Sequence, residues 1–230
     1  MRVVGVDACR GGWVAVALTD GVVSGLDTAA SLGEVITGSA AAVGIDMPLG
    51  LLESGWREAD RQARLLLGPR RSSVFAIPPR AVWMQPDYAD ANRLCRELTG
   101  KGFSVQAWNL RPKLLEANSF LATSGYPLFE VHPELAFASL GGEPLALSKH
   151  TAPGRELRRE LLAGAGILVP GMPRVPGMPG VPGMPGVPTA DVLDAAAAAW
   201  SAQRIATGRA ATIPDPPECD ETGRDIAIRY

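Results

Sequence analysis

The sequence predicts an α/β domain organised around a five-stranded mixed sheet. Near the amino terminus, short apolar runs are separated by Gly-rich turns, a pattern typical of antiparallel strands. Further along, apolar runs alternate with segments of helical periodicity that end at glycine, which indicates parallel strands connected by helices. The chain has 230 residues, of which 47% are hydrophobic and 20% are charged. This length and composition fit one buried core, so we expect residues 1–230 to form a single domain.

The amino-terminal strands are predicted by their apolar, β-branched content and by the turns between them. The turn at residues 9–12 contains two glycines, and Asp20-Gly21 is a strong hairpin signal. The three expected strands span residues 2–7, 13–18 and 22–26. A short helix is expected at 31–37. The uninterrupted apolar run at 41–45 predicts a fourth strand that is parallel and covered on both faces.

Most of the later elements are predicted to be helical. The expected helices are residues 56–67, 88–98, 113–123, 154–164 and 190–207, with a fifth strand at 128–132. The first three helices form a helical insertion, at about residues 55–125, between strands four and five. Residues 169–188 differ, because proline recurs at every third position of a Val-Pro-Gly-Met-Pro repeat. Proline excludes a helix or a central strand, so we expect a disordered Pro/Gly/Met-rich loop with no chemistry of its own.

The predicted order of elements is that of a ribonuclease H-like domain. Three antiparallel strands are followed by a parallel fourth strand, a parallel fifth strand and a closing helix. In this arrangement the first strand is central and neighbours the fourth. Gly5 and Gly44 lie within these two strands, where glycine permits the close approach of another backbone.

Four aspartates are the main candidate functional residues. The first strand ends at Asp7 and the fourth at Asp46, so the two carboxylates are expected roughly 5 Å apart at one edge of the sheet. Asp191 and Asp194 are spaced i and i+3 at the start of the last helix and share one face. Such a cluster repels itself unless divalent cations bind it, and its oxygen ligands favour Mg²⁺ or Mn²⁺. Taken singly, each aspartate is also explained as a turn or helix-start residue.

The segment Glu-Val-His-Pro-Glu at residues 130–134 is a second candidate. Glu130 and His132 alternate onto one face of the fifth strand. Glu130 is a candidate catalytic or metal-binding residue. His132 is a candidate for proton transfer, although a hydrogen-bonded structural histidine fits the pattern equally well. The candidate substrate-binding cations, chosen because Lys and Arg recognise phosphate, are Lys149, Arg155 and Arg10.

Charge is distributed unevenly along the chain. The formal net charge is -2, yet between residues 56 and 115 eleven Lys or Arg residues stand against five Asp or Glu residues. A basic segment beside an acidic cluster suits a polyanion held near metal ions, and it equally suits a solvated surface. Trp83 and Trp108 lie in this segment and are interpreted as core residues. A basic stripe at helical spacing is formed by Arg57, Arg61 and Arg64.

Cysteine usage and hydropathy indicate the compartment. The three cysteines are far apart and form no zinc-binding spacing. The chain enters a strand by its third residue, which leaves no signal peptide, and no apolar run is long enough to span a membrane. A reduced cytoplasmic setting without membrane attachment is therefore expected.

Several ordered motifs resemble one known family. The motifs are GVDACRGGW, GIDMPLGL, RRSSVFAIPPR, EVHPELAF and DVLDAAAAAW. They are similar to those of the family called domain of unknown function 429, and the likeness covers residues 1 to about 209. The resemblance implies a ribonuclease H-like fold and a predicted nuclease. A more distant similarity is to Holliday-junction resolvases, whose acidic metal ligands correspond to Asp7, Asp46, Asp191 and Asp194. At the second of these positions the resolvases carry Glu.

These observations lead to the hypothesis of a metal-dependent nuclease. It would hydrolyse phosphodiester bonds by a two-metal carboxylate mechanism, with Mg²⁺ or Mn²⁺ held by Asp7, Asp46 and Asp194. Its partner would be nucleic acid or another phosphodiester substrate. One alternative is a non-catalytic module that binds nucleic acid or protein; another is a nucleotide-binding phosphotransferase, a class that needs two lobes. The carboxyl-terminal run at residues 225–230 leaves strand pairing within the chain or across a homodimer open.

Overall fold

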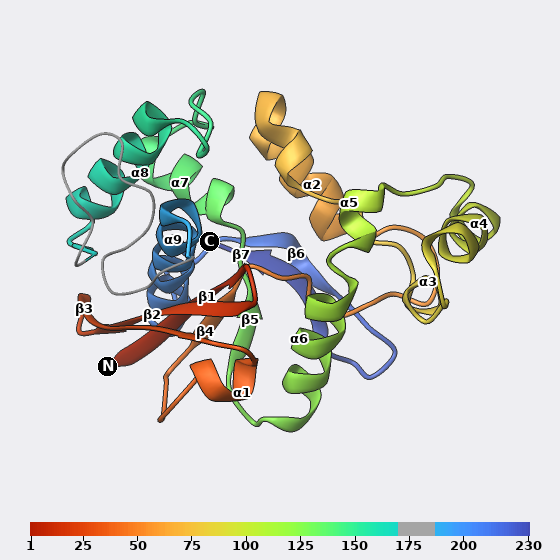
Figure 1. Cartoon of the computed structure of the whole chain (residues 1–230), viewed down its shortest axis with the longest axis horizontal. Coiled ribbons are helices and arrows are strands. Elements are labelled where there is room, and N and C mark those ends of the chain that lie inside the picture. The colour runs from red at the N-terminus through yellow and green to blue at the C-terminus, as the bar shows by residue number, and fades with distance from the viewer. Residues whose placement is uncertain (170–186) are drawn as a thin grey trace.

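A computed structural model describes residues 1–169 and 187–230 and shows a mixed α/β protein (Figure 1). Its main sheet has the strand order β3-β2-β1-β4-β5. The strands are β1 (Arg2–Cys9), β2 (Gly12–Thr19), β3 (Val22–Ala29), β4 (Val43–Ile45) and β5 (Leu128–Glu130). The first three pair antiparallel, whereas β4 runs parallel to β1 and β5 parallel to β4. The predicted five-stranded mixed sheet, with the first strand at its centre, is confirmed.

The helices begin and end where local chemistry favours it. They are α1 (Leu32–Val35), α2 (Glu58–Leu67), α3 (Arg80–Trp83), α4 (Tyr88–Thr99), α5 (Val105–Trp108), α6 (Arg111–Thr123), α7 (Pro133–Gly141), α8 (Ala152–Gly164) and α9 (Thr189–Ala206), with a 3-10 helix, η1 (Gly68–Ser73). For example, the Asp87 side chain accepts a hydrogen bond of 3.0 Å from the Asp90 N–H at the start of α4. Gly100 ends that helix with a left-handed φ of 76°.

The strands differ from the prediction in their bounds and in their number. The fifth strand was expected to extend to His132, but it ends at Glu130 because Pro133 begins α7. A strand from Thr212 to Cys219, β6, was not predicted, since it contains three prolines. It pairs antiparallel with β7 (Asp225–Arg229), so the carboxyl-terminal run pairs within the chain. Of the predicted loop at 169–188, residues 170–186 lie outside the described residues.

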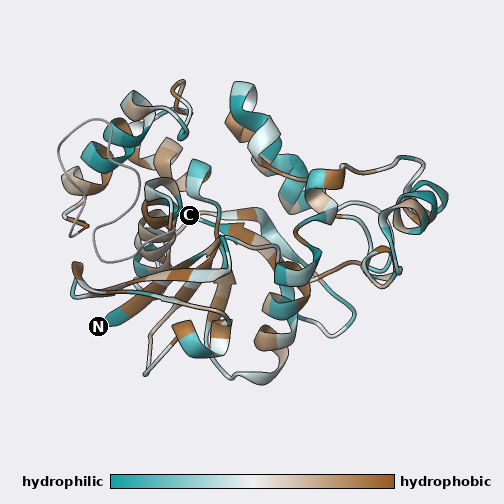
Figure 2. Ribbon diagram, in the orientation of Figure 1, coloured by the Kyte–Doolittle hydropathy of each residue, from teal (hydrophilic) through white to brown (hydrophobic). Residues whose placement is uncertain are grey.

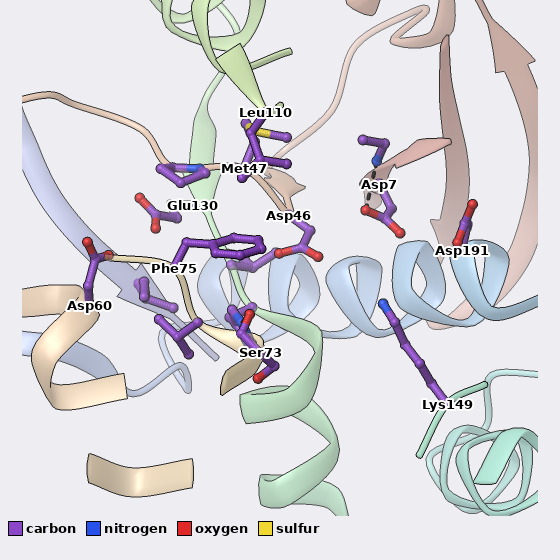
Figure 3. A pocket seen from close by; sticks show the side chains of 16 residues that line it. Asp7, Asp46, Met47, Asp60, Ser73, Phe75, Leu110, Glu130, Lys149 and Asp191 are labelled. Carbon is purple, nitrogen blue, oxygen red and sulfur yellow. Dashed lines mark hydrogen bonds between the residues drawn. The ribbon is translucent and has the colours of Figure 1, made fainter. Parts of the chain in front are cut away.

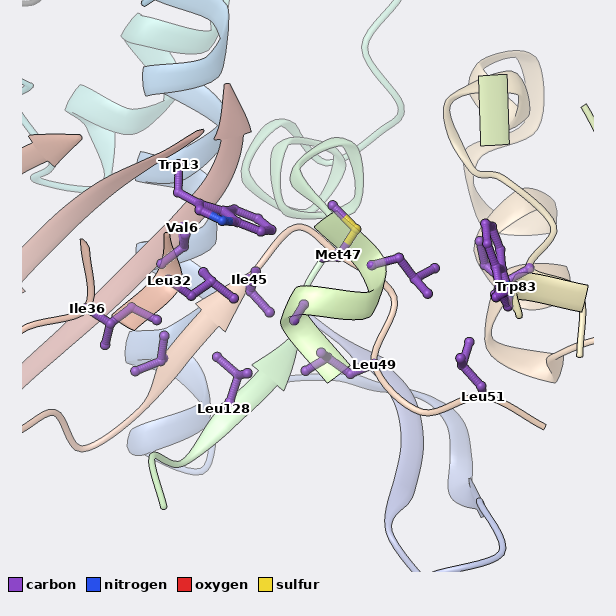
Figure 4. Packing of buried hydrophobic residues seen from close by; sticks show 14 of the residues in the cluster. Val6, Trp13, Leu32, Ile36, Ile45, Met47, Leu49, Leu51, Trp83 and Leu128 are labelled. Atoms are coloured by element: carbon purple, nitrogen blue, oxygen red, sulfur yellow. The ribbon is translucent and has the colours of Figure 1, made fainter. Parts of the chain in front are cut away.

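The sheet is covered on both faces because its strands alternate side chains. On β1, Val4 and Val6 join one buried cluster with α1 and α6, and Val3 faces a second cluster formed with α7, α8 and α9. Figure 4 shows the first cluster, in which Trp13 and Ile45 pack beside Val6. In Figure 2 the apolar colour concentrates on the strands and on α9, and α4 is largely hydrophilic.

Helix α9 lies unusually close to the centre of the sheet. A Cβ atom on Gly5 would lie 2.0 Å from the backbone nitrogen of Ala199 and 2.2 Å from the carbonyl oxygen of Ala195. A Cβ atom on Gly44 would lie 2.6 Å from the carbonyl oxygen of Ala198. The prediction that these glycines permit a close backbone approach is confirmed. On the helix side of this contact, α9 carries a run of alanines, whose side chains are small. The glycines and the alanines together let α9 pack closely against the sheet.

We expect Gly5→Ala to destabilise the protein by about 3 kcal/mol, because the added methyl group meets helix backbone that cannot rotate away. The measurement is the free energy of unfolding in urea. Gly164→Ala is the control, since a Cβ there meets nothing within 4 Å. Equal stability of the two variants would show that α9 can shift away from β1 at no cost.

None of the helices in residues 1–169 and 187–230 combines the length and apolar character needed to cross a membrane.

Candidate functional site

The four candidate aspartates come together where β1, β4 and α9 meet. Asp7 lies near the end of β1, and Asp46 follows β4 directly, with its N–H donating to the Val6 carbonyl at 2.9 Å. Asp191 and Asp194 lie in the first two turns of α9. Asp7 and Asp194 are buried, with exposed fractions of 7% and 1%. We call these four residues the carboxylate cluster.

Lys149 supplies a positive charge to the carboxylate cluster. It lies between α7 and α8, and its Nζ forms an ion pair with Oδ2 of Asp194. Partial burial alone would lower the pKa of Lys149, but the ion pair with Asp194 and the nearby Asp7 and Asp46 raise it. Lys149 therefore stays charged and offsets part of the negative charge. Figure 3 shows its ammonium group directed toward the aspartates.

Burial and mutual repulsion shift the pKa values of the cluster upward. The pKa of Asp7 is raised well above its ordinary value by burial and then by the charges of Asp46 and Asp194. Burial raises the pKa of Asp46 to about 7, with a further contribution from Asp194, and burial raises that of Asp191 to about 6. The pKa of Asp194 is also raised by burial, despite Lys149. Without additional positive charge, the folded protein thus resists full ionisation of the cluster.

We expect Asp46→Asn to gain stability over the unmodified protein as pH rises from about 4 to about 7. A carboxyl whose folded pKa is raised binds more protons in the folded state, so its contribution to stability is lost as pH rises from the ordinary value of 3.8 to about 7. Because Asp46 is only half-buried, the gain should be about 1–2 kcal/mol. Urea unfolding in EDTA across this range measures it, with the exposed Asp27→Asn as control. A pH-independent difference in stability would contradict a raised pKa for Asp46.

A pocket with a volume of about 230 Å³ opens beside the cluster. Asp7, Asp46, Asp191 and Lys149 contribute to its polar wall. Its apolar lining includes Met47, Phe75 and Leu110, which come from three distant segments of the chain. Figure 3 shows the Phe75 ring extending toward Asp46.

Glu130 also lines this pocket, but its carboxylate is already engaged. Nη2 of Arg57 lies 2.7 and 2.6 Å from its two oxygens, and the Leu49 N–H donates to Oε2 at 2.8 Å. Arg57 is 1% exposed and also lies 3.6 Å from Asp60, so these three residues form a buried arginine network. Burial raises the pKa of Glu130 to about 7, against the opposing effect of Arg57. Glu130 therefore serves as a structural wall of the pocket in this arrangement.

The predicted basic stripe is thus divided between the interior and the surface. Arg57 is in the arginine network, whereas the Arg61 side chain is 62% exposed and pairs with Glu58. Arg64 donates from Nη1 to the Val74 carbonyl at 2.6 Å. The helical spacing alone does not reveal this division, because it does not show which side of α2 meets the rest of the protein.

His132 lines the pocket and is held at one nitrogen. Its Nε2 lies 3.4 Å from the Ser73 carbonyl oxygen, and its Nδ1 is buried with no hydrogen-bond partner among the described residues. Burial lowers the pKa of His132, which favours the neutral ring. Next to it, Glu134 accepts from the fully buried Arg158 at 2.7 Å and from Arg70 at 3.4 Å.

The other two candidate cations lie apart from the carboxylate cluster. Arg155 donates from Nη1 to the His150 carbonyl at 2.9 Å and does not line the pocket. Arg10 is exposed and lines a separate cavity of about 510 Å³ at the β1–β2 turn. The interpretation of Trp83 and Trp108 as core residues is confirmed, since Trp83 is fully buried and the two rings stack with centroids 6.2 Å apart.

The carboxylate cluster fits a hard divalent cation in its chemistry. Its donors are carboxylate oxygens, and burial followed by their mutual repulsion raises the pKa of Asp7 even with Lys149 nearby. Its side chains are not preset as ligands, because residues 1–169 and 187–230 contain no group of three or more His, Cys, Asp or Glu arranged around one metal position. The excess negative charge, and not a finished coordination geometry, is what supports cation binding here.

Several residues of the site were missed by sequence reasoning. Asp60 and Phe75 line the pocket, and Arg57 supports it through its ion pair with Asp60. In the sequence, nothing distinguishes Arg57 from the other arginines, Asp60 from an acid at a helix start, or Phe75 from an isolated aromatic residue. Phe75 lies in the motif RRSSVFAIPPR, and that motif was the one available signal. Its role depends on α2, because Arg64 and Asp60 of that helix hydrogen-bond to the segment.

Comparisons with known proteins give a family and nothing more specific. No curated protein and no solved structure matches the chain. One family model, described as "Protein of unknown function (DUF429)", matches residues 5–219. Because this match spans most of the sequence, from β1 to β6, the chain belongs to the DUF429 family.

Proposed function

We propose that this protein is a metal-dependent nuclease built on a ribonuclease H-like fold. The observation that carries the proposal is the carboxylate cluster itself. Asp7, Asp46 and Asp191 line one pocket, Asp194 is buried on α9 close to them, and burial and mutual repulsion raise the pKa values of all four. The strand order β3-β2-β1-β4-β5 supports the fold assignment, because it combines an antiparallel meander with two parallel strands.

The residues take distinct roles in this proposal. Asp7, Asp46 and Asp194 would hold Mg²⁺ or Mn²⁺. When bound, such ions lower the pKa of water and stabilise the leaving oxygen of a phosphodiester. Lys149 offers its ammonium as a point charge to a phosphate oxygen and limits repulsion within the cluster. Asp191 is half-buried and lines the pocket, so it can assist by accepting a hydrogen bond from water.

One observation favours a non-catalytic binding module instead. Lys149 already pairs with Asp194, and the cluster is not preset around a metal among the described residues. Such a module would need no metal ion. The phosphotransferase alternative gains no support, because the described residues form one five-stranded sheet and a two-stranded hairpin, not two nucleotide-clasping lobes.

A cleavage assay with metal titration tests the proposal. Purified protein is incubated with labelled single-stranded, duplex, hybrid and four-way-junction nucleic acids in Mg²⁺, Mn²⁺ or EDTA, and Mn²⁺ binding is measured by calorimetry. Metal-dependent cleavage that Asp46→Asn removes would support the nuclease. An absence of both cleavage and Mn²⁺ binding would leave the binding module.

A further inference from the structure

The pocket has two chemically different parts. Asp7, Asp46 and Lys149 provide charged groups that suit a phosphate with its counterions, whereas Met47 and Phe75 offer apolar contact. A nucleotide has the same division between a charged phosphate and a flat, weakly polar base. The pocket therefore matches a nucleotide in two respects: its charged part suits the phosphate, and its apolar part suits the base.

Phe75 is held in place by bonds to the backbone on both sides. Arg64 donates to the carbonyl of Val74 at 2.6 Å, and the N–H of Ile77 donates to Asp60 Oδ2 at 2.9 Å. Both partners lie on α2, so the segment carrying Phe75 is attached to one helix. The half-buried ring thus forms part of the pocket wall without having to be ordered by a ligand, which lowers the entropic cost of stacking.

The other large aromatic side chains nearby are used in packing. Trp83, Phe103, Trp108 and Tyr88 contact one another with ring centroids 5.7 to 6.5 Å apart. None of these four lines the pocket. Among the described pocket-lining residues, Phe75 is therefore the benzenoid ring that can meet a base.

The size of the pocket limits how much nucleic acid can enter. Its volume of about 230 Å³ is below the roughly 300–1,000 Å³ of pockets that enclose drug-sized ligands. One base fits such a space, and a stacked base pair does not. In a duplex the bases are stacked and paired inside the helix, so a base reaches an aromatic wall only after leaving the stack.

His132 adds a polar side chain to the pocket wall. Its buried Nδ1 has no hydrogen-bond partner among the described residues, although the side chain lines the pocket. A buried ring nitrogen left unpaired is costly, and the edge of a base carries both donors and acceptors. A polar side chain in the pocket wall, independent of Phe75, suits an occupant that carries donors and acceptors at its edge.

We propose that the pocket takes one unpaired nucleotide, with its base against Phe75 and its phosphate at the carboxylate cluster and Lys149. This inference rests on the proposed nuclease function and specifies its substrate as single-stranded or locally unpaired nucleic acid. Stacking on an aromatic side chain tolerates any base, so little sequence preference is expected.

Binding of a fluorescent base tests the inference separately from cleavage. The probe is a short DNA strand containing 2-aminopurine, whose emission falls when the base stacks on an aromatic ring. It is offered single-stranded and within a duplex, with Ca²⁺ in place of Mg²⁺. We expect quenching and tighter binding for the single strand. Phe75→Ala should weaken single-strand binding about tenfold, equivalent to about 1.4 kcal/mol, and Phe75→Trp should restore it.

The control variant is Phe120→Ala. Phe120 is also half-buried, but it stacks on Tyr126 at 5.8 Å and does not line the pocket. Equal binding of single strand and duplex, or equal effects of Phe75→Ala and Phe120→Ala, would overturn the inference. If metal-dependent cleavage is observed in that case, the proposed nuclease function is still supported and only the nucleotide-pocket inference is wrong. Phe75-dependent binding without cleavage in Mg²⁺ or Mn²⁺ would support the nucleotide pocket and overturn the proposed catalysis.

Discussion

Replacing Asp7 by Asn is expected to abolish metal-dependent cleavage while making the folded protein more stable. Asp7 lies on the central strand and is 7% exposed, and its pKa is raised first by burial and then by the charges of Asp46 and Asp194. Asparagine keeps the shape but lacks the charge needed to hold a divalent cation. Losing several kcal/mol of transition-state stabilisation corresponds to at least about a 100-fold lower rate. In EDTA at pH 7, the removed charge should add about 1–3 kcal/mol to the free energy of unfolding.

The two readouts together distinguish a catalytic aspartate from a structural one. Cleavage rates are measured in saturating Mn²⁺, and unfolding free energies are measured in urea with EDTA. The exposed strand residue Asp27, changed to Asn, should alter neither quantity. If Asp7→Asn keeps its activity, the carboxylate cluster is not the catalytic site. If it loses stability, Asp7 is held by favourable contacts and not by repulsion that a metal must relieve.

Replacing Arg57 by Met is expected to cost about 3–5 kcal/mol of stability. The guanidinium is buried and lies 2.6 Å from Glu130 and 3.6 Å from Asp60. Without it, two buried carboxyl groups either remain charged in an apolar setting or must take up protons. The cost should decrease as pH falls toward about 7 and then level off, because loss of Arg57 raises the folded pKa of Glu130 further, so that the variant takes up its proton at higher pH than the unmodified protein. Urea unfolding at several pH values measures this change.

Two further variants separate the buried network from a general loss of charge. Arg61→Met removes an exposed arginine from α2, which begins directly after Arg57, and should have a much smaller cost. Adding Glu130→Gln to Arg57→Met should recover part of the stability, because one uncompensated acid is removed. Similar costs for Arg57→Met and Arg61→Met would show that the network contributes little. If the double variant is no more stable than Arg57→Met, the uncompensated Glu130 carboxyl group is not the cause of the lost stability.

Much of the fold could be predicted because it is encoded over short distances. The apolar run before Asp7, the Asp20-Gly21 turn and the alanine run of α9 each specify a local structure that packing then retains. Predictions failed where a local signal was overruled by tertiary contacts. β6 contains three prolines and still pairs with β7. The expected strand through His132 failed for a local reason, since β5 ends at Glu130 and Pro133 begins α7.

The candidate site was predictable only in part for a similar reason. A carboxylate at the end of an apolar strand is visible in the sequence, so Asp7 and Asp46 can be selected from local pattern alone. Arg57 cannot, because its distinguishing property is that α2 turns it toward Glu130, 73 residues away. Lys149 was expected to bind phosphate, but its ion pair with Asp194 depends on how the segment before α8 meets α9.

By itself, the sequence determined most of the secondary structure, the order of strands in the main sheet and the placement of four acids at strand ends and at the start of the last helix. These properties follow from hydrophobic periodicity and turn chemistry, which act over a few residues. Only the tertiary structure decided which charged groups are buried together and which aromatic ring lines the pocket. Burial, repulsion and ion pairing depend on distances between segments that lie far apart in the chain, and no local pattern contains those distances.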